Sequence, residues 1–173
     1  MRKQGVRSAE TQLFRQEMAI ASALQAVTQG DSVLISNLLS KGQISVNTDL
    51  KGTRLLHEAS RLGYAPVVAM LLERGADYRL TNCLNESALD LAMRYGQVKC
   101  VKPLREAGAN VEVALHLFSE ISEHRKGAML AYLREEIFPD IHWRETRAIC
   151  FLCRHQALRL PLNLVRLMCQ YLS

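Results

Sequence analysis

The chain has 173 residues, of which 49% are hydrophobic and 23% are charged, and these ordinary proportions exclude a fibrous or intrinsically disordered protein. A chain of this length suits one compact domain with a sizeable core. Its formal net charge of +5 comes from 22 Lys and Arg against 17 Asp and Glu, without the block of like charges that is typical of a nucleic-acid-binding tail. We therefore expect no nucleic-acid partner.

Apolar runs such as residues 67–72 stop far short of the roughly 18 residues needed to cross a bilayer, so no membrane partner is expected. Charged residues are spread through residues 1–21 and leave no apolar stretch for a secretory signal. The five cysteines are odd in number and widely separated, unlike those of a disulfide scaffold, so we expect them to be reduced. These features predict a cytoplasmic or nuclear protein.

In chain order, residues 1–18 come first and are expected to form an N-terminal extension. From about residue 19 the chain repeats itself with a period of 33 residues, so that Gly63 falls on Gly96 and Leu71 falls on Leu104. A weaker copy lies one period earlier, with Gly30 in the place of Gly63. Tandem copies of this length predict a repeat architecture.

Each copy has the apolar spacing of two helices. In the middle copy, residues 55–62 form a short helical segment that ends at Gly63. A second helix follows, with Gly75 just past its last turn and with an apolar stripe formed by Val67, Val68, Leu71 and Leu72. One helix pair cannot cover its own apolar face, so neighbouring copies must stack. The predicted fold is therefore an all-α solenoid of about three to four helix pairs.

The repeated pattern resembles the ankyrin repeat over about residues 19–111. The middle copy carries the family pattern at Gly52, Leu56, His57, Ala59, Gly63, Val67, Val68, Leu71, Leu72, Gly75, Ala76 and Asp77, and the next copy at Leu89, Ala92, Gly96, Val101, Leu104, Gly108, Ala109 and Asn110. The Thr-Pro that opens the first helix of the family repeat is absent from both copies. Arg54-Leu55 and Ser87-Ala88 stand there, which predicts looser helix starts, and Pro103 inside a second helix predicts a kink.

His57 stands at the histidine position of the ankyrin pattern, where the resemblance implies a hydrogen bond to loop backbone in place of a catalytic role. The sequence contains no Gly-rich phosphate loop, no HExxH and no GxSxG. We therefore expect a protein that is not an enzyme, with no catalytic residues, no cofactor and no metal.

The ankyrin resemblance implies a surface for a protein partner, here called the client, on the loop tips and the exposed positions of the first helices. Arg61 and Arg94 are one period apart, and we expect them to form a basic row suited to an acidic peptide. The alternative is two solvated arginines. The whole predicted client surface comprises Thr28, Gln29, Leu50, Lys51, Thr53, Arg61, Leu62, Cys83, Leu84, Glu86, Arg94 and Tyr95.

Beyond Val111 the 33-residue match fails, but helical patterns continue. One amphipathic segment spans residues 113–121, and another follows Gly127 up to Ile137. We interpret them as a degenerate final repeat, so that the repeats occupy residues 19–137. Pro139 then breaks the pattern and predicts a boundary before a C-terminal helical box or cap at residues 138–173.

The C-terminal segment has an apolar stripe formed by Ile149, Cys153 and Ala157, followed by Leu160, Pro161 and Leu164. This order resembles the SOCS box, which binds elongin B/C and guides a cullin, and its second half also resembles the opening of an F-box, which recruits Skp1. The resemblance implies that these six residues bind an adaptor of a cullin-type ubiquitin ligase. The alternative is a plain cap, because amphipathic stripes usually pack in a core.

Cys150, Cys153, His155 and Cys169 offer the ligand types of a zinc site, but on one helix His155 points away from the cysteine pair, so zinc is not expected.

The predicted function is a non-enzymatic adaptor that binds a client on its repeats and recruits a ligase through its tail. The alternative is a simple binding module or inhibitor, including a bacterial or viral effector in the host cytoplasm, with the tail as a cap.

Overall fold

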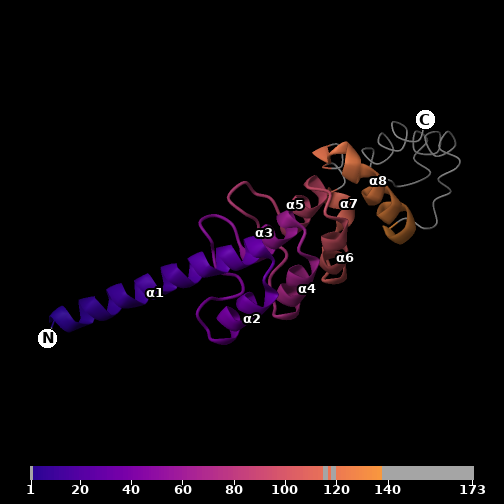
Figure 1. Cartoon of the computed structure of the whole chain (residues 1–173). Helices are drawn as coiled ribbons and strands as arrows, with labels where there is room; N and C mark the ends of the chain where they lie inside the picture. Colours follow the sequence, from indigo (N-terminus) through magenta and orange to yellow (C-terminus); the bar gives the residue numbers. More distant parts are fainter. Residues whose placement is uncertain (1, 115–116, 118–119, 138–173) are drawn as a thin grey trace, which may run out of the picture.

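The computed structural model describes residues 2–114, 117 and 120–137, and the predicted C-terminal box lies outside them. The described chain is a succession of helices joined by short turns and longer loops, and Figure 1 shows successive helix pairs stacked along one direction. The helices are α1 (Arg2–Gln29), α2 (Ser32–Ser40), α3 (Leu55–Leu62), α4 (Ala65–Glu73), α5 (Ala88–Arg94), α6 (Val98–Glu106), α7 (Val111–Ala114), α8 (Glu123–Tyr132) and the π-helical turn η2 (Leu133–Ile137).

The helix pairs are α1 with α2, α3 with α4, and α5 with α6, and each pair packs on the next. Helix α3 lies between α1 and α5, so these three form an inner row, while α2, α4 and α6 form the outer row. The predicted all-α fold is confirmed: within the described residues, the β contacts are two isolated bridges, Asp49 with Arg54 and Thr81 with Ser87. None of the described helices is long and apolar enough to span a membrane.

The core follows the 33-residue period. Ile35, Val68 and Val101 occupy equivalent positions on the three outer helices, and all three side chains are fully buried. Leu71 and Leu104 are also fully buried, one period apart. Burial of each such side chain contributes roughly 1.5 to 3 kcal/mol to folding. The predicted apolar stripe therefore forms a continuous core through the stack.

Turns between paired helices use equivalent glycines. Gly30, Gly63 and Gly96 have φ angles of +70°, +89° and +62°, a left-handed conformation that other residues adopt only with strain. A side chain of the next layer lies against the first two of these glycines, Tyr64 on Gly30 and Gln97 on Gly63. Each glycine therefore provides both the turn and the space for close packing between repeats.

The helix starts differ from one another. Arg54 precedes α3 and makes no side-chain capping bond, as expected for a looser start. The prediction was wrong for α5, because Ser87 and Asp90 form a capping box there. The Ser87 hydroxyl accepts from the Asp90 backbone N–H at 3.2 Å, and the Asp90 carboxylate accepts from the Ser87 backbone N–H at 2.8 Å.

The remaining helices agree only in part with the predicted pattern. Pro103 lies inside α6, as expected, but α8 begins at Glu123, so that Gly127 lies inside a helix and does not precede one. In the segment predicted for residues 113–121, the described residues include the end of α7, and Leu117 and Ile121 are buried. At the N-terminal end, α1 runs without a break through residue 18, so the predicted extension and the start of the first repeat share one helix.

Candidate protein-binding surface

Two loops join the helix pairs, and internal hydrogen bonds hold their tips. In the loop between α2 and α3, the Leu50 N–H donates to the Thr53 carbonyl at 2.7 Å. In the loop between α4 and α5, the Asn82 side-chain oxygen accepts from the backbone N–H groups of Leu84 and Glu86, both at 2.9 Å. The two loops are also joined to each other, because the Cys83 N–H donates to the Gly52 carbonyl at 2.7 Å. The loop tips are therefore held by hydrogen bonds of their own backbone and of the Asn82 side chain.

The structure divides the predicted loop residues into exposed and buried ones. Lys51 and Cys83 are exposed, Thr53 is partly buried, and Leu84 is 72% exposed at its loop tip. Leu50 was predicted to contact a client, but it is 2% exposed, because its apolar side chain packs into the hydrophobic core. A partner therefore cannot reach its side chain.

Glu86 was also predicted at the client surface and is in fact buried. Its carboxylate forms an ion pair with Arg94 and accepts from the Asn82 side-chain amide at 2.9 Å. A buried carboxylate requires such partners, because removing its hydration is costly. Glu86 therefore stabilises its loop through buried contacts with Asn82 and Arg94.

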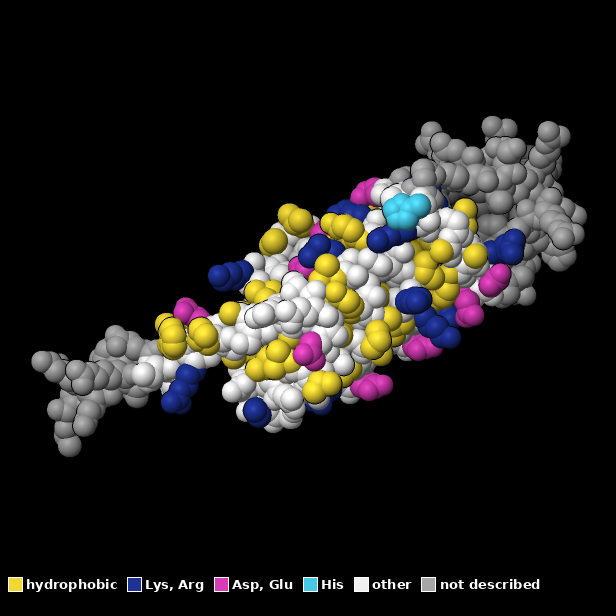
Figure 2. Space-filling model, in the orientation of Figure 1, with side chains coloured by type: hydrophobic (Ala, Val, Ile, Leu, Met, Phe, Trp, Pro, Cys, Tyr) yellow, Lys and Arg dark blue, Asp and Glu magenta, His cyan; other side chains and the backbone are white. Residues whose placement is uncertain are grey.

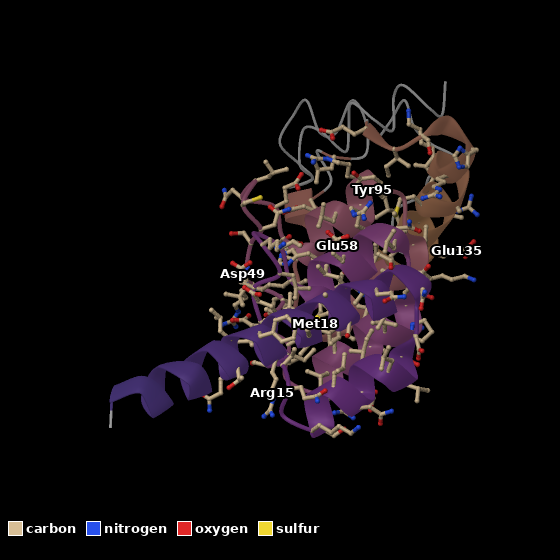
Figure 3. The ribbon with its side chains drawn as sticks, turned by 60° about the vertical axis from the view of Figure 1, so that its left-hand side comes forward. Arg15, Met18, Asp49, Glu58, Tyr95 and Glu135 are labelled. Atoms are coloured by element: carbon tan, nitrogen blue, oxygen red, sulfur yellow. The ribbon has the colours of Figure 1, made fainter. Side chains whose placement is uncertain are left out.

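The inner helices carry the rest of the predicted surface, and Figure 3 labels Met18, Glu58 and Tyr95 along α1, α3 and the end of α5. Thr28 and Gln29 are exposed, Leu62 is partly buried, and Tyr95 is 42% exposed. The Arg125 guanidinium donates to the Tyr95 carbonyl at 2.6 Å, which ties this position to α8.

The predicted basic row is neutralised. The Arg61 guanidinium pairs with Glu58 at 2.7 Å, and Arg94 pairs with both Glu86 and Glu120, the latter at 2.7 Å. Arg61 also lies over the Tyr95 ring, with 6.0 Å from its guanidinium carbon to the ring centre. Glu58 is three residues from Arg61 on one helix, so this pair was visible in the sequence, whereas Glu120 is 26 residues from Arg94.

His57 has the role implied by the ankyrin pattern. Its ring is buried in α3, and Nε2–H donates to the Leu80 carbonyl in the next loop at 2.9 Å. Burial lowers the pKa of His57 below its ordinary value, and the Leu80 carbonyl offsets this only in part. The neutral imidazole therefore acts as a structural tie between a helix and a loop.

A groove that was not predicted lies at the N-terminal end of the stack. It has a volume of about 780 Å³ and lies between the middle of α1, the end of α2 and the loop that follows α2. Phe14 and Met18 on α1 stand at its edge, 64% and 54% exposed. A single repeated pattern gives no signal for this groove, because it depends on contact between α1 and a loop more than twenty residues away.

Figure 2 shows the distribution of side chains over one face of the stack: hydrophobic, basic and acidic groups are interspersed there. Among the described residues, no group of three or more His, Cys, Asp or Glu side chains is arranged to hold a metal ion. The predicted adaptor-binding residues and the four residues weighed as zinc ligands all lie outside the described part of the chain; they are Ile149, Cys150, Cys153, His155, Ala157, Leu160, Pro161, Leu164 and Cys169.

Comparison with known proteins agrees with the repeat geometry. A family model described as ankyrin repeats, three copies, matches residues 23–114. One similar relative is the putative E3 ubiquitin-protein ligase XBAT31 of Arabidopsis thaliana, which is 32% identical over 99 residues. The match covers 56% of this chain and 21% of that relative. The chain thus spans about a fifth of the length of the relative that it matches.

Proposed function

Because the chain belongs to the ankyrin-repeat family, we propose that it is an adaptor that binds a client protein across its loop tips and inner helices. Ankyrin repeats are protein–protein interaction modules, so the family itself implies a protein partner. The exposure of Leu84 indicates which surface binds the client. This large apolar side chain is 72% exposed on a loop tip that Asn82 holds in position. A rigid, exposed apolar anchor is typical of the residues that dominate binding energy at interfaces.

Tyr95 provides a second anchor on the same surface. Its ring is held from one side by Arg61, and its backbone carbonyl is held by Arg125. Aromatic side chains that are already ordered lose little conformational entropy on binding, which favours their use at interfaces. Since Arg61 and Arg94 are already paired with carboxylates, this part of the surface favours a client that is recognised mainly through apolar contacts.

We further propose that the adaptor connects its client to a cullin-type ubiquitin ligase through residues 143–173, in the cytoplasm or nucleus. Two facts support this proposal: the likeness of the tail to a SOCS box or an F-box, and the name of the relative XBAT31, a putative ubiquitin-protein ligase. The partner would be elongin B/C or Skp1. The alternative is a simple binding module in which the tail caps the stack.

The test is affinity capture from a eukaryotic lysate with the full chain and with two matched variants. Leu84→Asp places a charge on the proposed surface, whereas Val33→Asp places one at an equally exposed apolar position on α2. We expect Leu84→Asp to lose the captured client and Val33→Asp to retain it, with little change in melting temperature for either. Equal capture by both variants would contradict the proposed surface.

A further inference from the structure

Helix α1 is much longer than its counterparts. The first residue of α3, Leu55, corresponds by the 33-residue period to Ser22, which lies far inside α1. In the two later repeats, the chain before the inner helix forms a loop, whereas here the same position is occupied by some twenty residues of helix. Figure 1 shows this part of α1 projecting beyond the stack.

The groove beside α1 has an apolar floor and edge. Ala19 on α1, Leu38 on α2 and Ile44 in the following loop are buried at its base, and Phe14 and Met18 stand exposed along its edge. The groove volume of about 780 Å³ falls within the range of roughly 300–1,000 Å³ typical of ligand sites. Exposed large apolar side chains beside such a groove indicate a surface for a partner.

The polar side chains of the groove are neutral amides, the hydroxyls of Ser22, Ser45 and Thr48, and one cation. Gln12, Gln16 and Gln43 provide side-chain donors and acceptors, and Arg15 is the one ionisable residue among those that line the groove. Figure 3 labels Arg15 and Met18 on this part of α1. A site with a single uncompensated cation and no carboxylate attracts an anionic group and disfavours a basic one.

Arg15 differs from every other arginine whose side chain the structure describes. It has no hydrogen bond, ion pair or ring contact with the described residues. The other eight each engage a carboxylate, a carbonyl, a hydroxyl or a ring; they are Arg54, Arg61, Arg74, Arg79, Arg94, Arg105, Arg125 and Arg134. The guanidinium at the groove is therefore available, with its forked set of donors, to an incoming carboxylate.

We propose that this groove binds an apolar peptide segment of a protein client that carries one Asp or Glu. The peptide carboxylate pairs with Arg15, and its apolar side chains cover Phe14 and Met18 and enter the groove above Leu38 and Ile44. The amide side chains bond to the peptide backbone at the rim. This inference rests on the proposed function and adds a second contact region, at the end of the stack away from Leu84 and Tyr95.

The probe is a phage-displayed library of random dodecapeptides, selected on the full chain, with selected peptides then titrated by fluorescence anisotropy. We expect enrichment of peptides that combine Leu, Ile or Phe with one acidic residue. Arg15→Gln should weaken their binding at least about tenfold and remove most of its salt dependence, because a charge-assisted pair is lost. Met18→Asp should abolish binding.

Two matched variants serve as controls. Lys41→Gln removes an exposed positive charge next to the groove, and Val33→Asp adds a charge at an exposed apolar position on α2; both should bind the peptides as the unchanged chain does. Melting temperatures should be alike for all four variants, because all four side chains are exposed.

Three outcomes would overturn the inference. The first is no enrichment of acidic apolar peptides. The second is enriched peptides that depend on Leu84 and are unaffected by Arg15→Gln and Met18→Asp, which would leave the proposed function standing. The third is a chain that sediments as a dimer and is converted to a monomer by Met18→Asp, which would mean that a second copy occupies the groove.

Discussion

His57 and Leu80 show how a residue that looks catalytic serves the fold. The imidazole lies in the core, where burial favours the neutral ring, and its Nε2–H donates to the Leu80 carbonyl of the next loop at 2.9 Å. Its Nδ1 is buried without a hydrogen-bond partner among the described residues. Protonation would place a second N–H at Nδ1, where the described residues provide no acceptor. The folded state should therefore disfavour protonation of His57.

This arrangement predicts a pH dependence of stability. The pKa of His57 in the folded chain is below 6.5, so the unfolded chain binds more protons below about pH 6.5. The free energy of unfolding should be independent of this group above pH 6.5 and should fall as the pH decreases, by at most about 1.4 kcal/mol per pH unit. His57→Gln retains a donor for Leu80 and should lose less stability than the unchanged chain between pH 7.5 and 5.5 in urea titrations.

The two described cysteines should differ in reactivity. Cys100 is fully buried in α6, and burial raises the pKa of its thiol to about 12, so almost none of it is thiolate at neutral pH. Cys83 is exposed at a loop tip. We expect iodoacetamide at pH 8 to label Cys83 in the folded chain and to label Cys100 only after unfolding, as measured by peptide mass spectrometry. Labelling of both at similar rates would contradict the packing of α6.

At the scale of helices, neighbouring repeats are tied by side chains that reach the end of the preceding inner helix. The Tyr64 hydroxyl donates to the Thr28 carbonyl at 2.9 Å, and the Gln97 amide donates to the Arg61 carbonyl at 3.0 Å, one period later. Each donor lies close to the turn glycine of the repeat before it. These bonds satisfy carbonyls that a helix end would otherwise leave unpaired.

Gly63 is therefore a strict requirement of the interface between repeats. Alanine there would meet the Gln97 amide and would be strained at a φ of +89°, so we expect Gly63→Ala to destabilise the chain by about 2 to 4 kcal/mol. Gly42→Ala is the matched control: its φ is +64°, but nothing lies within 4 Å of the added methyl group. It should cost only about 1 kcal/mol of backbone strain. Equal losses of unfolding free energy for the two variants in urea titrations would mean that the Gln97 side chain moves away from the added methyl group at little cost.

At the scale of the whole molecule, client binding by the repeats and ligase recruitment by the C-terminal tail can be tested independently. The outer and inner rows form one continuous core, so a substitution that destabilises one repeat should also destabilise its neighbours. A cap that covers the last repeat would share this coupling. A tail that recruits a ligase adaptor would instead keep its apolar stripe for that partner.

Ile149→Asp distinguishes the two roles of the tail. If residues 143–173 bind an adaptor, we expect the variant to lose the ligase partner in affinity capture while its client and its melting temperature are retained. The measurement pairs a thermal melt with capture on the same protein preparation, and Leu84→Asp provides the converse control. A large drop in melting temperature, with no partner lost relative to the unchanged chain, would support a cap and end the ligase proposal.

The repeat, the all-α class and the core positions can be recognised in the sequence alone. The period of 33 residues and the helical stripes predicted α3 to α6 and the buried positions Val68, Leu71 and Leu104, and the family resemblance predicted the bond of His57. These features are predictable because they depend on residues a few positions apart, or on the same position in successive copies, and both leave a pattern in the chain.

Tertiary packing, in contrast, determines which of the predicted client-surface side chains are exposed. Leu50 and Glu86 stand in loops, and no local rule places one in the core and the other in an ion pair with Arg94. The pairing of Arg94 with Glu120 and the groove beside Arg15 likewise join segments that are far apart in the chain. Such contacts follow from how the layers pack, and each occurs once, so repetition in the sequence carries no trace of them.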